Sequence, residues 1–303
     1  MMRVVITGGT GLIGSALARD RGEAGHEVII LTRDPARTGS LPPGVRAVQW
    51  DGRTAAGWSS LLDRDTAVVH LAGESIAAGR WSEARKRRIR ESRVESGRVV
   101  LAAIRQAPEK PRVLLQGSAV GYYGRSGDEV VTESHLPGDD FLASVCVDWE
   151  SATAEAESLG VRRAVLRTGI VLSRTGGALP RMALPFRLMA GGPLGNGRQW
   201  VPWIHLADEV GAIRFLLERD DARGPFNLTA PRPLTNRDFS RALGKALHRP
   251  SLAPAPGFAL RLVLGEMADM LLYGQRAVPQ RLLEHGYAFQ YPEALGALRD
   301  LLD

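Results

Sequence analysis

The chain has 303 residues, of which 44% are hydrophobic and 24% charged, and its formal net charge is +6. A chain of this size can bury one sizeable α/β core and a smaller lobe. It has no apolar run long enough to span a membrane, and its single cysteine, Cys146, excludes an internal disulfide and a cysteine-rich metal site. Because a strand is predicted within the first residues, we expect no signal peptide, no membrane partner and a cytoplasmic location.

The N-terminal stretch Val4–Gly14 reads Val-Val-Ile-Thr-Gly-Gly-Thr-Gly-Leu-Ile-Gly, and a segment with helical spacing follows it. A strand, a glycine turn and a helix in this order are typical of a dinucleotide-binding site. Gly8 allows the sharp turn, Gly11 lets the backbone approach a pyrophosphate, and Gly14 lets the helix pack closely on the sheet. The start of the helix then offers free N–H groups to the phosphates. A tight turn without a ligand is the alternative.

The next predicted strand, 27–32, ends about 20 residues beyond the glycine turn, where NAD-binding proteins carry an acid for the ribose. Here the strand ends in Thr32, and Arg33 and Asp34 follow. A guanidinium at this place can pair with a 2′-phosphate and stack on adenine, which favours NADP over NAD. The alternatives are a solvated Arg33 and a competing Asp34. Asp51, just past the third strand, is predicted to contact adenine or to cap its own turn.

Strands and helices alternate regularly in the first half of the chain. The predicted strands are 3–7, 27–32, 45–49, 66–71, 112–117 and 163–168. The predicted helices are 12–24, 83–106 and 140–159. This order predicts an α/β fold with a Rossmann-type, doubly wound parallel sheet and a site at the carboxyl ends of its strands. The fourth strand is followed by Gly73, which therefore reaches the same edge.

The pattern changes after residue 170, where glycine pairs and prolines interrupt it. We expect a Rossmann domain over 1–170, with sheet elements returning near 200–230, and a substrate lobe over 171–303 whose last part is 250–303. Within the lobe, a short strand is predicted at 226–229, and helices are predicted at 209–217, from 235–236 onward and over 257–272.

The basic run Arg85-Lys86-Arg87-Arg88, with Arg90 and Arg93 after it, lies in a helical pattern that Glu83, Glu91 and Glu95 dilute. Arginine-rich helical faces are usually solvated, so we expect no nucleic-acid partner, and a phosphate-bearing small molecule accounts for some of these charges. The six histidines are dispersed and no pair has ligand spacing, so no metal site is expected.

The fifth strand ends in Leu-Leu-Gln-Gly-Ser-Ala-Val-Gly-Tyr-Tyr-Gly, residues 114–124. Ser118 leaves a central strand and can hydrogen-bond a substrate hydroxyl or carbonyl. Tyr122 and Tyr123 follow it, either as acids or as aromatic anchors of the loop.

These motifs together resemble an extended short-chain dehydrogenase/reductase. More closely, the chain resembles a subfamily named as nucleoside-diphosphate-sugar epimerases, which has its own C-terminal domain. The resemblance covers essentially the whole chain and depends on the glycine turn, His70–Gly73, Gly117–Gly124, Leu166–Gly169, Phe141–Glu150, Gly191–His205 and Leu264–Gln275.

The resemblance implies the remaining cofactor contacts. Thr10, Gly11, Leu12 and Ile13 are expected to line the pyrophosphate, and Leu71 and Ala72 to cover the adenosine. Val171 is expected near the nicotinamide. Arg93 occupies a position near the nicotinamide ribose where extended members usually carry an Asn.

The chain departs from the family at the usual catalytic pair, a Tyr and a Lys four residues apart. Spacing back from Gly160 places Val145 and Trp149 at these positions, and neither exchanges a proton. Cys146 and Glu150 are also four apart but lie about 100° further around the helix. An acid must then come from elsewhere on the same edge.

We expect Ser118 to orient a substrate oxygen and Tyr123 to be the acid, with Tyr122 packing below it and Arg93 as the neighbouring cation. Three functions remain open: an NADP(H)-dependent oxidoreductase or epimerase-like enzyme acting on a polar, sugar-like small molecule; an NADP(H)-binding protein with little turnover and a structural or redox-sensing role; and a nucleic-acid-associated protein. The oligomeric state is open.

Overall fold

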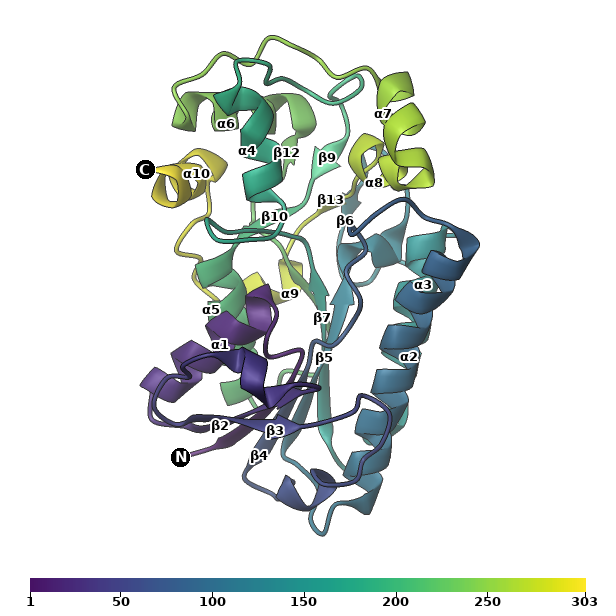
Figure 1. Ribbon diagram of the computed structural model, residues 1–303, viewed down its shortest axis with the longest axis vertical. Helices are drawn as coiled ribbons and strands as arrows, with labels where there is room; N and C mark the ends of the chain where they lie inside the picture. The colour runs from purple at the N-terminus through teal and green to yellow at the C-terminus, as the bar shows by residue number, and fades with distance from the viewer.

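A seven-stranded parallel sheet forms the centre of the computed structural model, which describes all residues apart from the side chain of Arg37 (Figure 1). Its strand order is β11-β7-β5-β4-β1-β2-β3. The strands are β1 Arg3–Thr7, β2 Glu27–Thr32, β3 Val45–Gln49, β4 Thr66–His70, β5 Val113–Ala119, β7 Arg162–Thr168 and β11 Gly224–Leu228. The prediction of a Rossmann-type sheet is confirmed, and β11 joins it from the second half of the chain.

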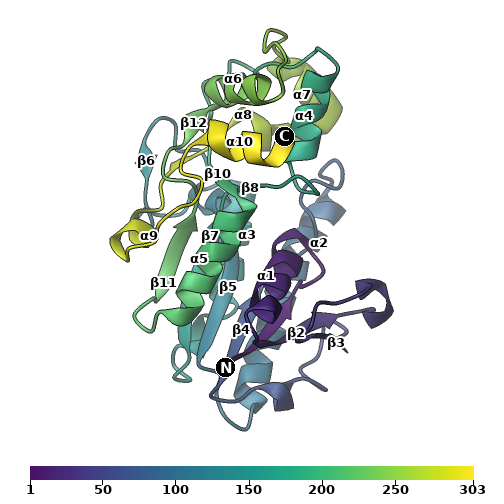
Figure 2. The same ribbon diagram turned by 90° about the vertical axis from the view of Figure 1, so that its left-hand side faces the viewer.

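Helices cover both faces of the sheet, as Figures 1 and 2 show. One face carries α1 (Leu12–Glu23) and α5 (Leu206–Glu218), and the other carries α2 (Glu83–Gln106) and α3 (Phe141–Ser151). Successive residues of β1 therefore enter opposite cores: Ile6 packs in the core beneath α1 and α5, and Val5 in the core beneath α2. Burial on both faces explains why this strand is a continuous apolar run.

A smaller lobe lies above the carboxyl ends of the strands (Figure 1). Its core contains side chains of three helices, α4 (Leu179–Arg187), α6 (Asn236–Ala246) and α10 (Ala294–Leu302). Its other elements are β8 Ile170–Leu172, β9 Trp200–Val201, β10 Trp203–His205, β12 Leu234–Thr235, α7 Gly257–Leu264, α8 Asp269–Leu272 and α9 Gln280–Glu284. A two-stranded pair, β6 Val130–Val131 with β13 Arg276–Ala277, joins the first half of the chain to the C-terminal region. The 3₁₀ turns are η1 Pro35–Thr38, η2 Ser59–Leu61, η3 Val120–Tyr123, η4 Ala154–Ala156 and η5 Gly265–Ala268.

Two predicted helices are wrong in part. The helix expected over 140–159 ends at Ser151, because Thr153 turns inward and its hydroxyl bonds to Gln116 and Arg163 on two strands at 2.9 and 3.0 Å. The helix expected over 257–272 breaks at Gly265, whose φ of +62° lies outside the helical region. None of the described helices is long and apolar enough to cross a membrane.

The buried Arg162 joins β7 to the end of α5. Its guanidinium donates to the carbonyl oxygens of Leu216, Leu217 and Ala222, each at 3.0 Å. The last carbonyls of a helix have no partner within the helix, so this side chain caps α5.

We predict that Arg162→Met lowers the free energy of unfolding by about 2–4 kcal/mol, because buried carbonyl groups lose their donors. Urea denaturation measures the change. The control is Arg64→Met, which removes an exposed pair with Glu109 and is expected to leave the unfolding midpoint in place. Equal midpoints for Arg162→Met and the wild type would contradict this role.

Candidate functional site

The glycine turn after β1 is closed by two near-contacts that exclude side chains. Gly8 has a φ of +71°, and a Cβ there would lie 2.8 Å from the carbonyl carbon of Leu71. A Cβ on Gly14 would lie 2.4 Å from the carbonyl oxygen of Gly8. A Cβ on Gly11, in contrast, would have Gly8 O at 3.3 Å as its nearest neighbour, and no side chain caps the first turn of α1. The turn therefore presents an open backbone and the start of a helix.

A cavity of about 1000 Å³ opens at this turn, along the carboxyl ends of β1, β2, β3 and β4. The predicted residues that line it are Gly8, Thr10, Gly11, Thr32, Arg33, Asp51, Leu71, Ala72 and Gly73. The structure thus brings together residues that are far apart in the sequence. Leu12, Ile13, Gly14, Arg93 and Val171 are not among its lining residues.

Three arginines line the cavity: Arg33 after β2, Arg53 after β3 and Arg88 on α2. Sequence reasoning missed Arg53 and treated Arg88 as part of a solvated face. The signal for Arg53 was its position two residues after Asp51, on a turn that reaches the same edge.

The two acids near this end have structural roles. Asp34 accepts from the backbone N–H of Ala36 at 3.2 Å and caps η1. The carboxylate of Asp51 accepts from the N–H groups of Arg53 and Thr54 at 2.8 and 2.9 Å, which lowers the pKa of Asp51. Asp51 therefore caps its turn, the alternative that its sequence position left open, and it also lines the cavity.

Arg93 lies beneath the loop after β4. Its Nη1 donates to the carbonyl oxygens of Glu74 and Ile89, both at 3.0 Å, and its guanidinium stacks 5.0 Å from the ring centre of Trp149. Its role toward a cofactor stays a prediction. Val171 belongs to β8 and precedes a turn at Gly177, where a Cβ would lie 3.0 Å from Leu12 of α1.

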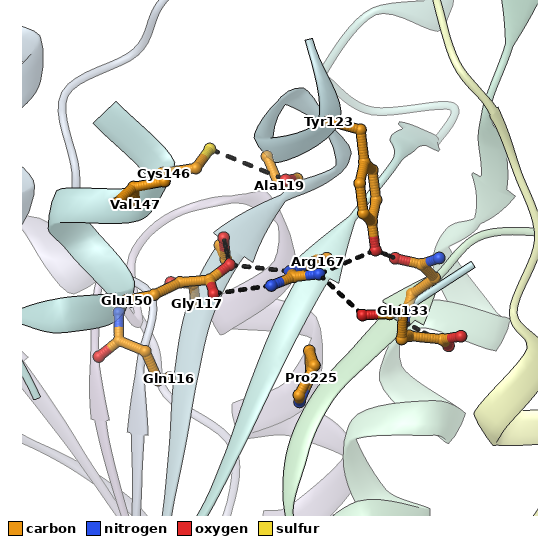
Figure 3. A network of polar contacts seen from close by, with 12 residues as sticks. Gln116, Gly117, Ala119, Tyr123, Glu133, Cys146, Val147, Glu150, Arg167 and Pro225 are labelled. Carbon is orange, nitrogen blue, oxygen red and sulfur yellow. Dashed lines mark hydrogen bonds and ion pairs between the residues drawn. The ribbon is translucent and has the colours of Figure 1, made fainter. Parts of the chain in front are cut away.

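A buried polar network lies at the ends of β5 and β7 (Figure 3). Ser118 donates to Glu150 Oε1 at 2.6 Å. Arg167, the register partner of Ser118 on β7, donates through Nε and Nη2 to both oxygens of Glu150, at 2.9 and 3.0 Å. Its Nη1 donates to the hydroxyl of Tyr123 at 3.0 Å, and Tyr123 donates to Asn227 on β11 at 2.7 Å. The network therefore ties α3 to three strands.

The two tyrosines differ in burial and in partners. Tyr123 is the buried one, with 4% of its surface exposed, and burial raises its pKa to about 12. Tyr122 is half-buried and stacks 3.5 Å from the Arg167 guanidinium. The Tyr123 proton is directed at Asn227, which disfavours Tyr123 as the acid. The Tyr122 ring packs edge-on against the Tyr123 ring, with 5.3 Å between the ring centres.

The positions on α3 at which we expected the usual catalytic pair hold buried apolar side chains. Val145 and Trp149 are both buried, and the Trp149 ring lies 3.0 Å from where a Cβ of Gly117 would stand. The thiol of Cys146 faces the carbonyl oxygen of Ala119 at 3.7 Å, and burial raises its pKa to about 11.

The sequence did not predict a role for Glu150, because Glu150 lies one residue past the position expected for the usual pair. A buried arginine at the end of β7, however, requires a carboxylate partner. That arginine, Arg167, was visible in the sequence.

The basic face of α2 is largely paired within the described part of the chain. Carboxylates of neighbouring segments bind Arg85 (Glu74 at 2.9 Å), Arg90 (Asp148) and Arg105 (Glu155). Arg98 pairs within the helix with Glu95 at 2.7 Å. No cluster of metal-ligating side chains occurs among the described residues.

We predict that Tyr123→Phe lowers the free energy of unfolding by about 1–3 kcal/mol, because Asn227 loses a buried donor. Tyr122→Phe is the matched control, since no hydrogen bond joins the Tyr122 hydroxyl to the described residues, and its effect should be clearly smaller. Chemical denaturation of both variants measures the difference. A larger loss in Tyr122→Phe would contradict the assigned contacts.

Comparison with known proteins agrees with this geometry. Residues 4–229 match the model of the NAD dependent epimerase/dehydratase family, and residues 255–301 match a domain of unknown function, DUF1731. An epimerase family protein of Mycobacterium bovis is 43% identical over 97% of this chain and 96% of its own length. The human epimerase family protein SDR39U1 is 38% identical over 99% of this chain and 100% of its own length.

Solved structures show the same relationship. The crystal structure of human SDR39U1 (isoform 2) with NADPH superposes with a TM-score of 0.89 at 37% identity and covers 99% of each chain. UDP-N-acetylglucosamine 4-epimerase from Bacillus cereus, at 16% identity and a TM-score of 0.77 over 99% of this chain and 95% of its own, shares the fold. The chain therefore belongs to the NAD dependent epimerase/dehydratase family, the extended short-chain dehydrogenase/reductases, and carries the DUF1731 domain at its C-terminus.

Proposed function

We propose that this protein binds NADP(H) in the cavity at the carboxyl ends of β1 to β4. The observation that carries the proposal is the combination of an uncapped helix start with three arginines on one cavity. Free N–H groups at a helix N-terminus suit a pyrophosphate, and guanidinium groups suit a further phosphate. The human relative's crystal structure with NADPH supports the same cofactor.

The residues present fit this cofactor. At Gly11 the backbone is open toward the cavity, so the pyrophosphate has the space that a Cβ would fill. Arg33 and Arg53 are exposed at the adenosine end and are placed for the 2′-phosphate. Asp34 already caps η1, so Arg33 is the side chain at the end of β2 that faces the cavity.

The proposed activity is that of an NADP(H)-dependent oxidoreductase or epimerase-like enzyme acting on a polar small molecule. NADP(H), when bound, supplies or accepts a hydride at the nicotinamide. Ser118 would orient the substrate. What supports this is that Ser118 follows Gln116, the last β5 residue paired with β4, by two residues, as Ala72 of the cavity lining follows His70. The lobe above this edge would enclose the substrate (Figure 2).

A second candidate is an NADP(H)-binding protein with little turnover. The observation that favours it is the burial of Val145, Trp149 and Tyr123, which leaves the usual acid positions without an available proton. Oxidation of NADPH with a panel of sugars, quinones and aldehydes separates the two. Turnover with any member supports the enzyme, and binding without turnover across the panel supports the second candidate.

We predict that the wild type binds NADPH at least about tenfold more tightly than NADH, because a charge-assisted contact to the 2′-phosphate exists only for NADPH. Arg33→Ala should remove most of this preference while NADH affinity stays the same. Titration calorimetry measures both affinities.

Arg219→Ala is the matched control, since Arg219 is an exposed arginine paired with Asp221 away from the cavity. It should keep the wild-type preference. Equal affinities of the wild type for NADPH and NADH would refute the assignment of Arg33.

Substitutions at Gly11 and Gly14 distinguish an effect on NADPH binding from an effect on folding. Gly11→Ala adds a methyl group on the cavity side at an ordinary extended backbone (φ −81°, ψ 176°), so it should weaken NADPH binding by roughly tenfold or more with little loss of stability. Gly14→Ala forces a Cβ against Gly8 O and should lower the free energy of unfolding by about 1–3 kcal/mol. Calorimetry with NADPH and thermal denaturation measure the two effects. A stability loss in Gly11→Ala together with weaker NADPH binding only in Gly14→Ala would contradict this description of the turn.

A further inference from the structure

The contact between Ser118 and Glu150 is short, at 2.6 Å between Oγ and Oε1. Ser118 has 5% of its surface exposed, and the Glu150 side chain 14%. A serine hydroxyl has one proton to donate and two lone pairs that accept. Which partner supplies the proton of this contact therefore decides what Ser118 can offer to a ligand.

The contacts of Arg167 identify the donor of the hydrogen bond between Ser118 and Glu150. Its guanidinium donates to both oxygens of Glu150, at 2.9 and 3.0 Å, and cannot give up its own charge. Burial lowers the pKa of Arg167, but its contacts with Glu150 and Tyr123 together outweigh burial and leave that pKa raised. Both oxygens of Glu150 accept from the guanidinium, and the Ser118 hydroxyl is the donor of the 2.6 Å contact.

The other groups around Ser118 do not change the direction of its hydrogen bond to Glu150. The thiol of Cys146 faces the carbonyl oxygen of Ala119 and also contacts the Ser118 side chain; burial raises the pKa of this thiol to about 11, so it does not take the Ser118 proton. The next member of the network, Tyr123, bonds to Arg167 (Figure 3). Asn227 in turn accepts from Tyr123. Once its proton is committed to Glu150, Ser118 keeps only lone pairs for a ligand.

We propose that Glu150, oriented by Arg167, fixes Ser118 as a hydrogen-bond acceptor, so that the site selects a substrate that presents a hydroxyl or N–H group to Ser118 over one that presents a bare carbonyl. The inference rests on the proposed function for the position of the substrate. Glu150 is a positioning residue in this scheme, and Ser118 is the residue that contacts the ligand. A carbonyl at this place meets lone pairs, unless Ser118 gives up a charge-assisted bond.

Neutron diffraction from deuterium-exchanged crystals of the wild type tests the direction of the bond without any ligand. We expect the deuteron on Ser118 Oγ, on the line to Glu150 Oε1, and none on the Glu150 carboxylate. A deuteron on Glu150, or a Ser118 O–D bond directed away from it, overturns the proposal.

Selectivity is tested with matched pairs, cyclohexanol with cyclohexanone and 1-phenylethanol with acetophenone, by ligand-observed NMR on the NADP⁺-saturated protein. The wild type should bind the alcohols roughly tenfold more tightly than the ketones, since a charge-assisted bond must break for the ketone. The preference should vanish in Ser118→Ala. Equal binding of alcohols and ketones to the wild type overturns the proposed selectivity. Undetectable binding of both alcohols overturns it as well.

Glu150→Gln tests the positioning role. A glutamine amide can donate to Ser118 Oγ, which frees the serine proton for a ligand, so the alcohol-to-ketone ratio should shift toward the ketones. Glu157→Gln is the control, because Glu157 is a half-exposed partner of Arg163 and should keep the wild-type ratio. An unchanged ratio in folded Glu150→Gln contradicts the proposal; if that variant does not fold, the neutron result and Ser118→Ala decide.

NADPH affinity, measured by calorimetry on the same proteins, separates this inference from the proposed function. Ser118→Ala should bind NADPH as the wild type does, because Ser118 lies outside the cavity lining. Loss of NADPH binding by the wild type itself would remove the proposed function. Failure of the alcohol preference with intact NADPH binding removes only the inference.

Discussion

The ion pair between Arg167 and Glu150 is the interaction on which the arrangement of side chains at the ends of β5, β7 and β11 depends. Both side chains are largely buried, and burying two charges is costly unless hydrogen bonds satisfy them. Arg167 meets this condition by donating to Glu150, Tyr123 and the carbonyl oxygen of Glu133. As a result the ends of β5, β7 and β11 are held together with α3 by one guanidinium.

The two ends of the proposed site consist of different groups, backbone at one end and buried side chains at the other. The adenosine end is made of backbone: a glycine turn and the start of α1 next to exposed arginines, which leaves phosphates accessible. The reaction end is made of buried side chains whose protons are already directed at partners, as the bonds from Ser118 and Tyr123 show. The cavity at the glycine turn is therefore open to a ligand, whereas the polar side chains at the ends of β5 and β7 are bonded to one another.

The sequence allowed the sheet and the cofactor end to be predicted because their signals are local. Gly8, Gly11 and Arg33 each lie within a few residues of a strand end, and parallel strands bring such ends together. Glu150 was missed because its partner, Arg167, lies 17 residues away on another element. The burial of Tyr123 could not be predicted for the same reason, since it depends on the turn of η3 and on Asn227 of β11. The end of α3 depended on Thr153, whose partners are on two strands.

A crystal structure of the NADPH complex tests the central claim most directly, because it locates both ends of the cofactor at once. The account predicts the pyrophosphate at the start of α1, the 2′-phosphate in contact with Arg33, and the nicotinamide on the side of Ser118, with the Ser118–Glu150 contact retained. A cofactor bound with its 2′-phosphate away from Arg33, or with its nicotinamide directed away from the end of β5, would contradict the account.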